Sequence, residues 1–249
     1  MSSQIIEGDC LEVLPTLADQ SVDCVFTDPP YGLEFNNGDL AHKREEALGV
    51  GPRGEPRPIS NDTREWFTNV LPQCFAEMSR ILRCGGCCCC CCGGGGPQPL
   101  FAEMTLALDR TPGFEFKQAV VWDKGGLGMG WHYRRSYEFV LIAQKKGAAC
   151  KWHDESHRVS NLIRIPKIIP AQDQHPTEKP SALAAFFIRL HSQEGDTVLD
   201  PFCGSGSTGE AALCLGRNFI GIDVEASYVA IARARCEQAE RQRQPALPM

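Results

Sequence analysis

The sequence predicts an α/β protein built on one largely parallel β-sheet with helices on both faces. Apolar segments of strand length alternate along the chain with longer segments whose apolar residues recur at helical spacing. Several strand segments are apolar throughout, as is typical of parallel strands covered on both faces. The chain has 249 residues, 43% of them hydrophobic and 22% charged, which suits a large globular α/β domain and disfavours disorder or coiled coil.

The elements are assigned from apolar patterning and from the turn residues between them. Residues 32–61 are rich in glycine, proline and charge without a clear period, and we predict a mobile surface loop there. Residues 146–174 are also irregular. Strands are expected at residues 5–6, 22–27, 87–92, 115–122, 137–144, 197–200 and 219–223. Helices are expected at residues 11–17, 62–82, 100–108 and about 180–190, and two more follow, one that ends at residue 215 and one that begins at about 226.

The clearest helical pattern begins near Asp62. Asp62 and Glu65 have the spacing of an N-terminal capping box, and the apolar residues after them recur every three or four positions. Gly85 and Gly86 are expected to stop this helix. The apolar positions are Trp66, Phe67, Val70, Leu71, Phe75, Met78, Ile81 and Leu82.

Six of the 14 cysteines form an unbroken run, Cys87 to Cys92, where an α/β protein would place its next strand. Free cysteine behaves as a small hydrophobe that is readily buried, so the run predicts a core strand in a reducing compartment. Neighbouring side chains of a strand point to opposite faces and cannot all bind one ion, so no metal site is expected. A metal-binding or redox protein built on the cysteines stays open as an alternative.

Charge and targeting signals limit the possible partners. The net charge of −6 argues against a protein coated in positive potential, so a nucleic acid would have to be bound locally. Residues 131–170 contain eight Lys and Arg residues against three Asp and Glu residues, interleaved with aromatic residues. The sequence contains neither a secretory signal nor a run of some 20 apolar residues, so we expect a cytoplasmic protein without membrane contact.

A glycine-containing turn follows the strand that ends at Asp200. Its sequence at 201–206 is Pro-Phe-Cys-Gly-Ser-Gly, and Asp223 ends the next strand. Glycines directly after a strand let the backbone turn tightly and approach a ligand, while a carboxylate on the following strand suits a ribose diol. This arrangement predicts a nucleoside-containing cofactor, although such a turn also occurs without a ligand.

The second motif is Asp28-Pro29-Pro30-Tyr31, at the end of the apolar strand 22–27. An ionised aspartate only accepts hydrogen bonds, and the carbonyl before a proline is a further acceptor, so the motif suits an amino group. The prolines stiffen the loop, and the tyrosine offers a flat face on which a base can stack. The alternative is a proline-stiffened turn with an exposed tyrosine.

Together with His-Pro-Thr-Glu-Lys-Pro at 175–180, these two motifs resemble those of the amino-group DNA methyltransferases, which use S-adenosylmethionine. The resemblance covers most of the chain. Because Asp28-Pro29-Pro30-Tyr31 precedes the glycine turn, the order is similar to that of the β class. The resemblance implies an α/β, circularly permuted Rossmann-like methyltransferase fold with a mostly parallel seven-stranded sheet in one domain, residues 1–249. The strands that end at Asp200 and Asp223 would be first and second in the usual order, and those ending near Asp9 and Asp28 third and fourth.

The resemblance also implies roles for individual residues. Asp28, Pro29, Pro30 and Tyr31 would be catalytic. Residues 202–206 would line the methionine end of S-adenosylmethionine, with Thr177 and Lys179 near its carboxylate, Asp223 on the ribose and Asp9 near the adenine. The cofactor-binding residues expected are Asp9, Thr177, Lys179, Asp200, Pro201, Phe202, Gly204, Ser205, Gly206 and Asp223.

The chemistry implied is methyl transfer to the exocyclic amine of a flipped-out base stacked on Tyr31. Hydrogen bonds from that amine to Asp28 and to the Pro29 carbonyl would favour a pyramidal nitrogen aimed at the methyl group. A motif that starts with Asp is closer to adenine-N6 than to cytosine-N4 enzymes, so we expect adenine-N6. Cytosine-N4 transfer, an RNA substrate and an inert nucleic-acid-binding module remain alternatives. The cysteines do not suggest C5-cytosine chemistry, because no Pro-Cys dipeptide supplies a nucleophile.

DNA is the expected partner, and the basic stretch is the expected contact surface. Residues 124–175 form the candidate target-recognition region. The protein is expected to be a monomer or a homodimer. The DNA-contact residues expected are His132, Tyr133, Arg134, Arg135, Lys151, Arg164 and Lys167.

Overall fold

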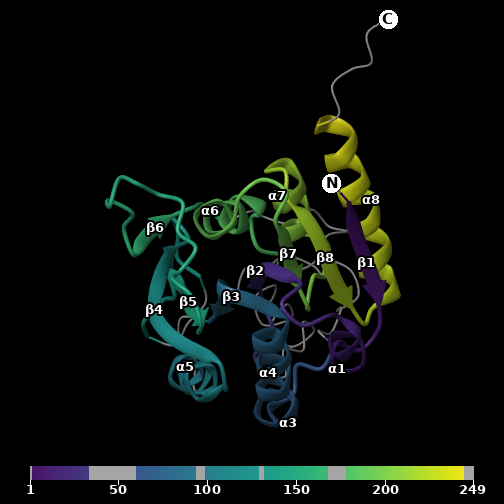
Figure 1. Cartoon of the computed structure of the whole chain (residues 1–249). Helices are drawn as coiled ribbons and strands as arrows, with labels where there is room; N and C mark the ends of the chain where they lie inside the picture. The colour runs from purple at the N-terminus through teal and green to yellow at the C-terminus, as the bar shows by residue number, and fades with distance from the viewer. Residues whose placement is uncertain (1, 34–59, 94–98, 129–131, 168–177, 244–249) are drawn as a thin grey trace, which may run out of the picture.

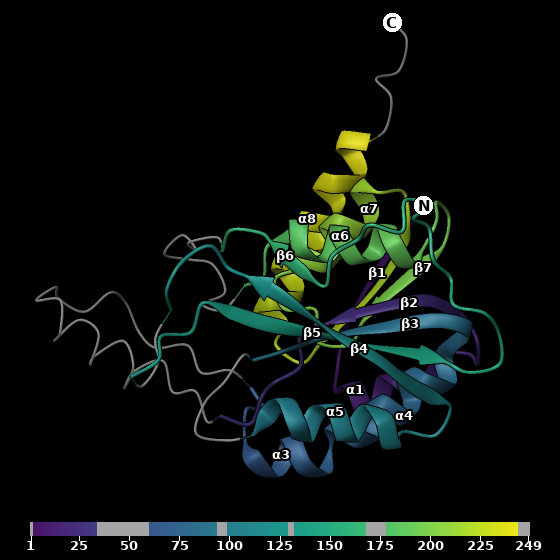
Figure 2. The same cartoon turned by 90° about the vertical axis from the view of Figure 1, so that its left-hand side faces the viewer.

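A central sheet lies between two layers of helices in the computed structural model, which describes residues 2–33, 60–93, 99–128, 132–167 and 178–243. Helices α6, α7 and α8 cover one face, and α1, α3, α4 and α5 cover the other (Figures 1 and 2). Both faces of the sheet are therefore buried, as the uniformly apolar strands predict. Within the described residues, no helix is both long and apolar enough to cross a bilayer.

The strands of the described chain lie in the order β1-β8-β7-β2-β3-β5-β4-β6. Neighbours from β1 to β3 are parallel, β5 is antiparallel to both β3 and β4, and β6 is parallel to β4. The predicted permuted order is confirmed, since β7 lies between β8 and β2, and β1 follows β8. The strands are β1 (Ser3–Glu7), β2 (Val22–Thr27), β3 (Leu82–Cys92), β4 (Phe114–Asp123), β5 (Tyr137–Lys145), β6 (Leu162–Arg164), β7 (Thr197–Asp200) and β8 (Asn218–Asp223).

The helices follow the predicted positions, with differences at their ends. They are α1 (Cys10–Val13), the 3-10 helix η1 (Leu14–Thr16), α3 (Arg64–Asn69), α4 (Leu71–Ile81), α5 (Leu100–Arg110), α6 (Ser181–His191), α7 (Ser207–Cys214) and α8 (Ala226–Arg243).

Three local expectations need correction. The sheet has eight strands in the described residues rather than seven, because the three-residue β6, too short to show alternation, pairs with β4. The helix predicted from Asp62 is divided into α3 and α4, since Pro72 lacks the N–H needed to continue a helix and instead lies in the first turn of α4. The N-terminal cap of α3 is Thr63 and not the predicted Asp62. The Thr63 side chain accepts a hydrogen bond from the Trp66 N–H, while the Asp62 side chain accepts one from the Leu33 N–H.

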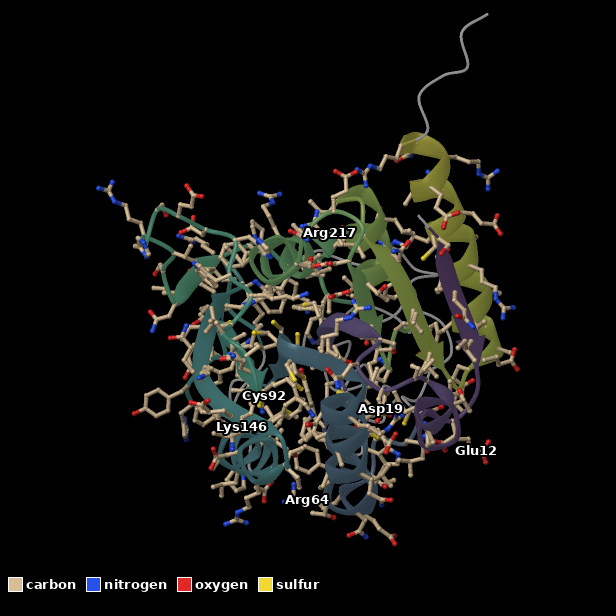
Figure 3. The ribbon with its side chains drawn as sticks, viewed as in Figure 1. Glu12, Asp19, Arg64, Cys92, Lys146 and Arg217 are labelled. Atoms are coloured by element: carbon tan, nitrogen blue, oxygen red, sulfur yellow. The ribbon has the colours of Figure 1, made fainter. Side chains whose placement is uncertain are left out.

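The cysteine run is a buried core strand, as predicted. All six side chains in Cys87 to Cys92 are at most 1% exposed, and they alternate between the clusters on the two faces of the sheet. Figure 3 shows sulfur atoms gathered around β3, with Cys92 labelled. Burial raises the pKa of the thiols of Cys88 to Cys92, that of Cys92 to about 12, so they stay protonated at neutral pH. The pKa of Cys87 is raised by a hydrogen bond with Cys150 and by burial. Strand β3 begins at Leu82, five residues earlier than predicted, and therefore includes Gly85 and Gly86. Its pairing with β2 shifts register between Val22 and Cys24, and this irregularity accommodates the additional residues.

Candidate active site

The candidate residues gather where neighbouring parallel strands end. The carboxyl ends of β1, β8, β7 and β2 meet at one edge of the sheet, which places Asp9, Asp223, the turn 201–206 and Asp28 along that edge. In open α/β sheets, this edge is where ligands bind. Two motifs about 170 positions apart in the sequence therefore lie side by side.

A buried hydrogen-bond cluster joins the ends of β2 and β7. The Thr27 hydroxyl donates to Asp200 Oδ1 at 2.7 Å, and the Thr208 hydroxyl donates to Asp200 Oδ2 at 2.7 Å. The Phe202 N–H also donates to Asp200 Oδ1, at 3.1 Å. Both carboxylate oxygens thus hold the turn that follows β7. Burial, which outweighs these hydrogen bonds, raises the pKa of Asp200 to about 7.

This pKa predicts a change of stability with pH. The ordinary pKa of the group is 3.8, so from about pH 4 to 7 the folded chain keeps a proton that the unfolded chain has lost. The contribution of Asp200 is full below pH 4 and falls by up to roughly 4 kcal/mol as pH rises through 7. In Asp200→Asn, urea unfolding across this window should show a flatter pH dependence than wild type. Equal slopes would contradict the raised pKa, and Asp109→Asn, which changes an exposed carboxylate of α5, is the control.

Gly206, the last residue of the turn 202–206, occupies a place that only glycine fits. Gly206 has φ +84° and precedes α7, and a Cβ there would stand 2.9 Å from Cα and Cβ of Ala232. The Gly204 N–H donates to Asp223 Oδ2 at 2.8 Å, and Asp223 Oδ1 accepts from the Glu225 N–H at 2.9 Å. Asp223 therefore lies directly beside the turn.

A second cluster holds the turn from the side of α8. The Ser205 hydroxyl donates to Glu178 Oε2 at 2.6 Å, and Glu178 Oε1 pairs with Arg235 at 2.9 Å. Arg235 also pairs with Glu210 of α7. Glu178 is 7% exposed, so this ion pair fixes Glu178, and with it the neighbouring Lys179, against the turn.

Asp28 contacts a tyrosine and a lysine through different oxygens. The Tyr31 hydroxyl donates to Asp28 Oδ1 at 2.6 Å, and Lys179 Nζ lies 2.8 Å from Asp28 Oδ2. Lys179 also pairs with Glu138 Oε2 at 3.3 Å, and Lys124 pairs with Glu138 Oε1 at 2.9 Å. Carboxylates and lysines thus alternate in the order Asp28, Lys179, Glu138 and Lys124, from the end of β2 to the end of β4.

The protonation of this cluster follows from its charges. Burial alone would lower the pKa of Lys179, but the carboxylates of Asp28 and Glu138 raise it above its usual value. Burial likewise opposes ionisation of Glu138, yet Lys179 and Lys124 keep its pKa below the ordinary range. Burial and the charge of Asp28 raise the pKa of Tyr31 well above 10.0. At neutral pH the cluster therefore contains an ammonium between two carboxylates, beside a neutral phenol.

Aromatic rings and prolines complete this end of β2. Lys179 Nζ lies 5.5 Å from the centre of the Tyr31 ring. Phe202 packs edge-on against Trp66 with ring centres 5.5 Å apart. Pro29 is buried, Pro30 is half-buried, and Pro201 is buried at the start of the turn. The acceptors of Asp28 are thus held beside the turn 202–206 by stiff backbone.

Three cofactor candidates remain: Asp9, Thr177 and Lys179. Asp9 caps α1, where its side chain accepts from the Leu11 N–H, and the neighbouring Gly8 N–H donates to the Asp223 carbonyl at 3.0 Å. Thr177 lies outside the described residues. Lys179 contacts Asp28 and Glu138, whereas the resemblance implies a contact with the methionine carboxylate.

Five residues of these clusters were not predicted from the sequence: Glu138, Lys124, Thr27, Glu178 and Arg235. Glu138 lies near the beginning of β5. Because β5 runs antiparallel to β3, its beginning lies at the edge of the sheet where the parallel strands end. Glu178 was within the recognised motif at 175–180, so its position beside Lys179 was the one available signal.

Most of the expected DNA-contact residues lie near one another, beyond the end of β4. The Gly128 N–H donates to the Arg135 carbonyl, and Arg134 Nε donates to the Gly128 carbonyl at 2.7 Å. The Lys167 N–H donates to the Lys124 carbonyl at 3.1 Å. Tyr133 is 87% exposed. His132, Arg134, Arg164 and Lys167 are also exposed.

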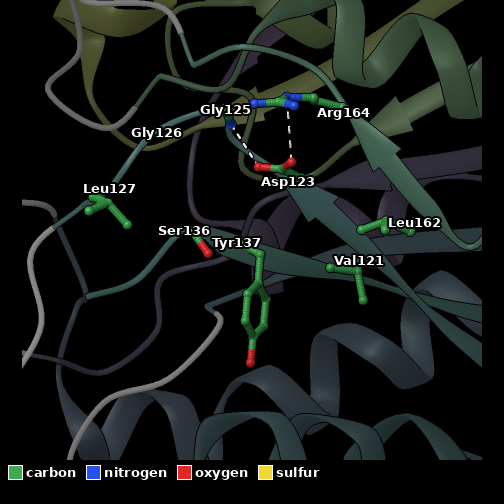
Figure 4. A pocket seen from close by; sticks show the side chains of 9 residues that line it. All are labelled: Val121, Asp123, Gly125, Gly126, Leu127, Ser136, Tyr137, Leu162 and Arg164. Atoms are coloured by element: carbon green, nitrogen blue, oxygen red, sulfur yellow. Dashed lines mark hydrogen bonds and ion pairs between the residues drawn. The ribbon is translucent and has the colours of Figure 1, made fainter. Parts of the chain in front are cut away.

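A pocket of about 430 Å³ opens beside this group. Figure 4 shows Asp123 between the Gly125 N–H and Arg164, with the Tyr137 ring on the other side of the pocket. The pocket does not include the turn 202–206, because its lining residues are Val121, Asp123, Gly125, Gly126, Leu127, Ser136, Tyr137, Leu162 and Arg164.

Lys151 is not part of this group. Its ammonium pairs with Asp23 Oδ1 at 2.7 Å, near the amino end of β2 and therefore at the opposite edge of the sheet from Asp28. Asp23 is 1% exposed and also binds Arg83 and the Thr197 N–H. Most of the predicted loop 32–61, residues 34–59, lies outside the described part of the chain.

Comparison with known proteins agrees with this geometry. Residues 22–234 match the family model described as DNA methylase, which covers N6 and N4 enzymes. The chain belongs to this family of amino-methyltransferases, as its motifs predict.

The similarity to individual relatives extends over nearly the whole chain. The DNA adenine methyltransferase YhdJ of Escherichia coli (strain K12) is 27% identical over 267 residues, covering 94% of this chain and 83% of that protein. The crystal structure of the M1.HpyAVI–SAM complex is similar with a TM-score of 0.67 at 27% identity, covering 94% of this chain and 98% of that one. The PvuII DNA methyltransferase (cytosine-N4-specific) shares the fold, with a TM-score of 0.69 at 20% identity over 94% of this chain and 86% of that one.

Proposed function

We propose that this protein transfers a methyl group from S-adenosylmethionine to the N6 amino group of adenine in DNA. The observation that carries the proposal is the placement of Asp28 beside the turn 202–206, on the neighbouring ends of β2 and β7. A nucleoside cofactor bound at the turn has its reactive group within reach of an amine held by Asp28. The family match and the similar solved SAM complex support the cofactor.

In the proposed reaction, the exocyclic amine donates hydrogen bonds to Asp28 and to the Pro29 carbonyl. These acceptors stabilise the positive charge that develops on nitrogen as the methyl group arrives. Tyr31 would stack on the flipped base while its hydroxyl, bonded to Asp28, orients the carboxylate. The methyl group moves in line from sulfur to nitrogen, and the amine then releases a proton to solvent. S-Adenosylhomocysteine is the second product.

The choice of adenine over cytosine rests on the Asp at the start of the tetrapeptide and on the adenine-specific relative YhdJ. The fold does not discriminate, because a cytosine-N4 enzyme shares it. DNA methylated by the pure protein should yield N6-methyladenine on digestion and mass analysis. N4-methylcytosine alone would refute the choice of base, transfer to RNA alone would refute DNA as substrate, and cofactor binding without any transfer would leave the inert binding module.

The group of exposed basic residues beyond β4 is the proposed DNA-contact surface. Arg134 and Arg135 lie next to exposed Tyr133, and Arg164 and Lys167 lie on the adjoining segment. Lys151 is the exception, since its charge is already paired with buried Asp23.

Replacing both Arg134 and Arg135 by alanine should weaken DNA binding and lower the slope of log affinity against log salt by about one per lost phosphate contact. The matched control is Lys151→Ala, for which we expect an unchanged salt slope and a lower unfolding free energy. Binding is measured by fluorescence anisotropy from low to moderate salt. An unchanged slope in the double variant would remove these arginines from the interface.

A further inference from the structure

A cluster of three metal-binding side chains lies outside the proposed active site. The Sγ atoms of Cys87 and Cys150 and a ring nitrogen of His191 all lie within 4.8 Å of one another. Cys87 lies on β3, Cys150 follows β5 and His191 ends α6, so three separate elements contribute. The objection that neighbouring strand residues cannot share an ion does not apply to this set.

The distances in the cluster suit a tetrahedral ion. Two thiolates bound to one Zn²⁺ at about 2.3 Å stand roughly 3.8 Å apart. The Cys87 and Cys150 sulfurs are 3.4 Å apart, so a shift of a few tenths of an ångström admits the ion. His191 is 4% exposed, and its Nδ1 is buried without a hydrogen-bond partner among the described residues. The imidazole of His191 also interacts with the Cys150 thiol, so the ring already faces one of the two sulfurs.

The backbone around the cluster is already in place. The Lys151 N–H donates to the Gly85 carbonyl at 2.9 Å, which ties the Cys150 segment to β3. The His153 N–H donates to the Leu190 carbonyl at 2.9 Å, which ties the same segment to the end of α6. The Trp152 ring packs edge-on against the His191 ring with centres 5.4 Å apart. Little ordering is therefore needed when the ligands close on an ion.

We propose that Cys87, Cys150 and His191 form a zinc site that fastens the segment after β5 to β3 and α6. Two thiolates and an imidazole are a ligand set that Zn²⁺ favours, and a solvent molecule would supply the fourth ligand. Both sulfurs bind the ion as thiolates, so a thiol proton that a ligand still carries is released on binding. The site is separate from Asp28, because Cys87 lies five residues, or roughly 16 Å along β3, from Cys92 at the catalytic edge.

Zinc titration of the full chain tests the proposal. Protein reduced with a phosphine, stripped with a chelator and desalted is titrated with ZnCl2 against a chromophoric chelator, and with CoCl2 to observe thiolate–metal charge-transfer absorption. Wild type should bind one equivalent and gain about 5–10 °C in Tm with zinc at about 100 times its Kd. Cys150→Ser should weaken binding at least tenfold and abolish the cobalt charge-transfer band or reduce it by half.

Two further variants complete the test. Cys150 is exposed, so its replacement should leave the fold intact, which circular dichroism checks. His191→Gln should also weaken zinc binding at least tenfold, whereas Cys214→Ser, which changes another exposed cysteine on α7, should bind as wild type. Absence of stoichiometric binding, equal affinity of wild type and Cys150→Ser, or a Cys87–Cys150 disulfide formed in place of zinc binding would each overturn the proposal.

Discussion

Asp28→Ala should lose methyl transfer almost completely, with kcat reduced about a thousandfold and S-adenosylmethionine binding retained. The expected loss is that of a group that accepts a hydrogen bond from the reacting amine and stabilises charge developing in the transition state. Cofactor binding should change by less than threefold, because the turn 202–206 is held by Asp200, Glu178 and Asp223 and not by Asp28. Tritium transfer from labelled cofactor to DNA measures kcat, and calorimetry measures the cofactor Kd.

Two controls separate catalysis from folding in this experiment. Asp28→Asn keeps an acceptor oxygen but loses the charge that pairs with Lys179, so intermediate activity is expected. Asp109→Ala removes an exposed carboxylate of α5 and should behave as wild type. If Asp28→Ala retains more than a tenth of the wild-type kcat, Asp28 does not have the proposed role.

The second large effect is expected at Lys179. Lys179→Met removes the cation between Asp28 and Glu138 and leaves two carboxylates facing each other at a half-buried site. We expect kcat at neutral pH to fall about a hundredfold, and the acidic limb of the pH profile of kcat to move to higher pH. The pKa of Glu138 should rise in this variant, because Lys179 is the charge that most lowers it.

A double variant shows whether Lys179 acts through charge. Lys179→Met with Glu138→Gln removes the opposing carboxylate as well, so the acidic limb should return toward its wild-type position. If Lys179 instead holds the methionine carboxylate, its loss would raise the Kd of S-adenosylmethionine and leave the acidic limb unmoved. Measuring kcat, its pH profile and the cofactor Kd on the same samples separates these two roles.

The meeting of the two motifs could be predicted because it depends on local signals, whereas the strand order came from the resemblance of those motifs to the amino-group DNA methyltransferases. Apolar runs ending at Asp28 and Asp200 mark parallel strands, and such strands end at a shared edge. The cysteine run was also readable, since six small hydrophobes in a row indicate a buried strand.

The side-chain network around the site could not be read in the same way. Glu138 reaches Lys179 only because β5 runs against its neighbours, and sequence patterning does not give strand direction. Lys151 counted as one more basic residue until the structure paired it with Asp23, 128 positions earlier. The cluster of Cys87, Cys150 and His191 likewise joins three distant segments. Long-range pairing of charges and ligands is set by tertiary packing and leaves no period in the chain.

The strand of six cysteines has a consequence for handling the protein outside a reducing environment. While the sheet is closed, its thiols are shielded on both faces and resist oxidants. Once the sheet opens, six adjacent thiols meet solvent together, and any disulfide that air forms among them prevents the strand from re-entering the core. Heat denaturation in air should therefore be a one-way process, whereas an excess of reductant should let the chain renature.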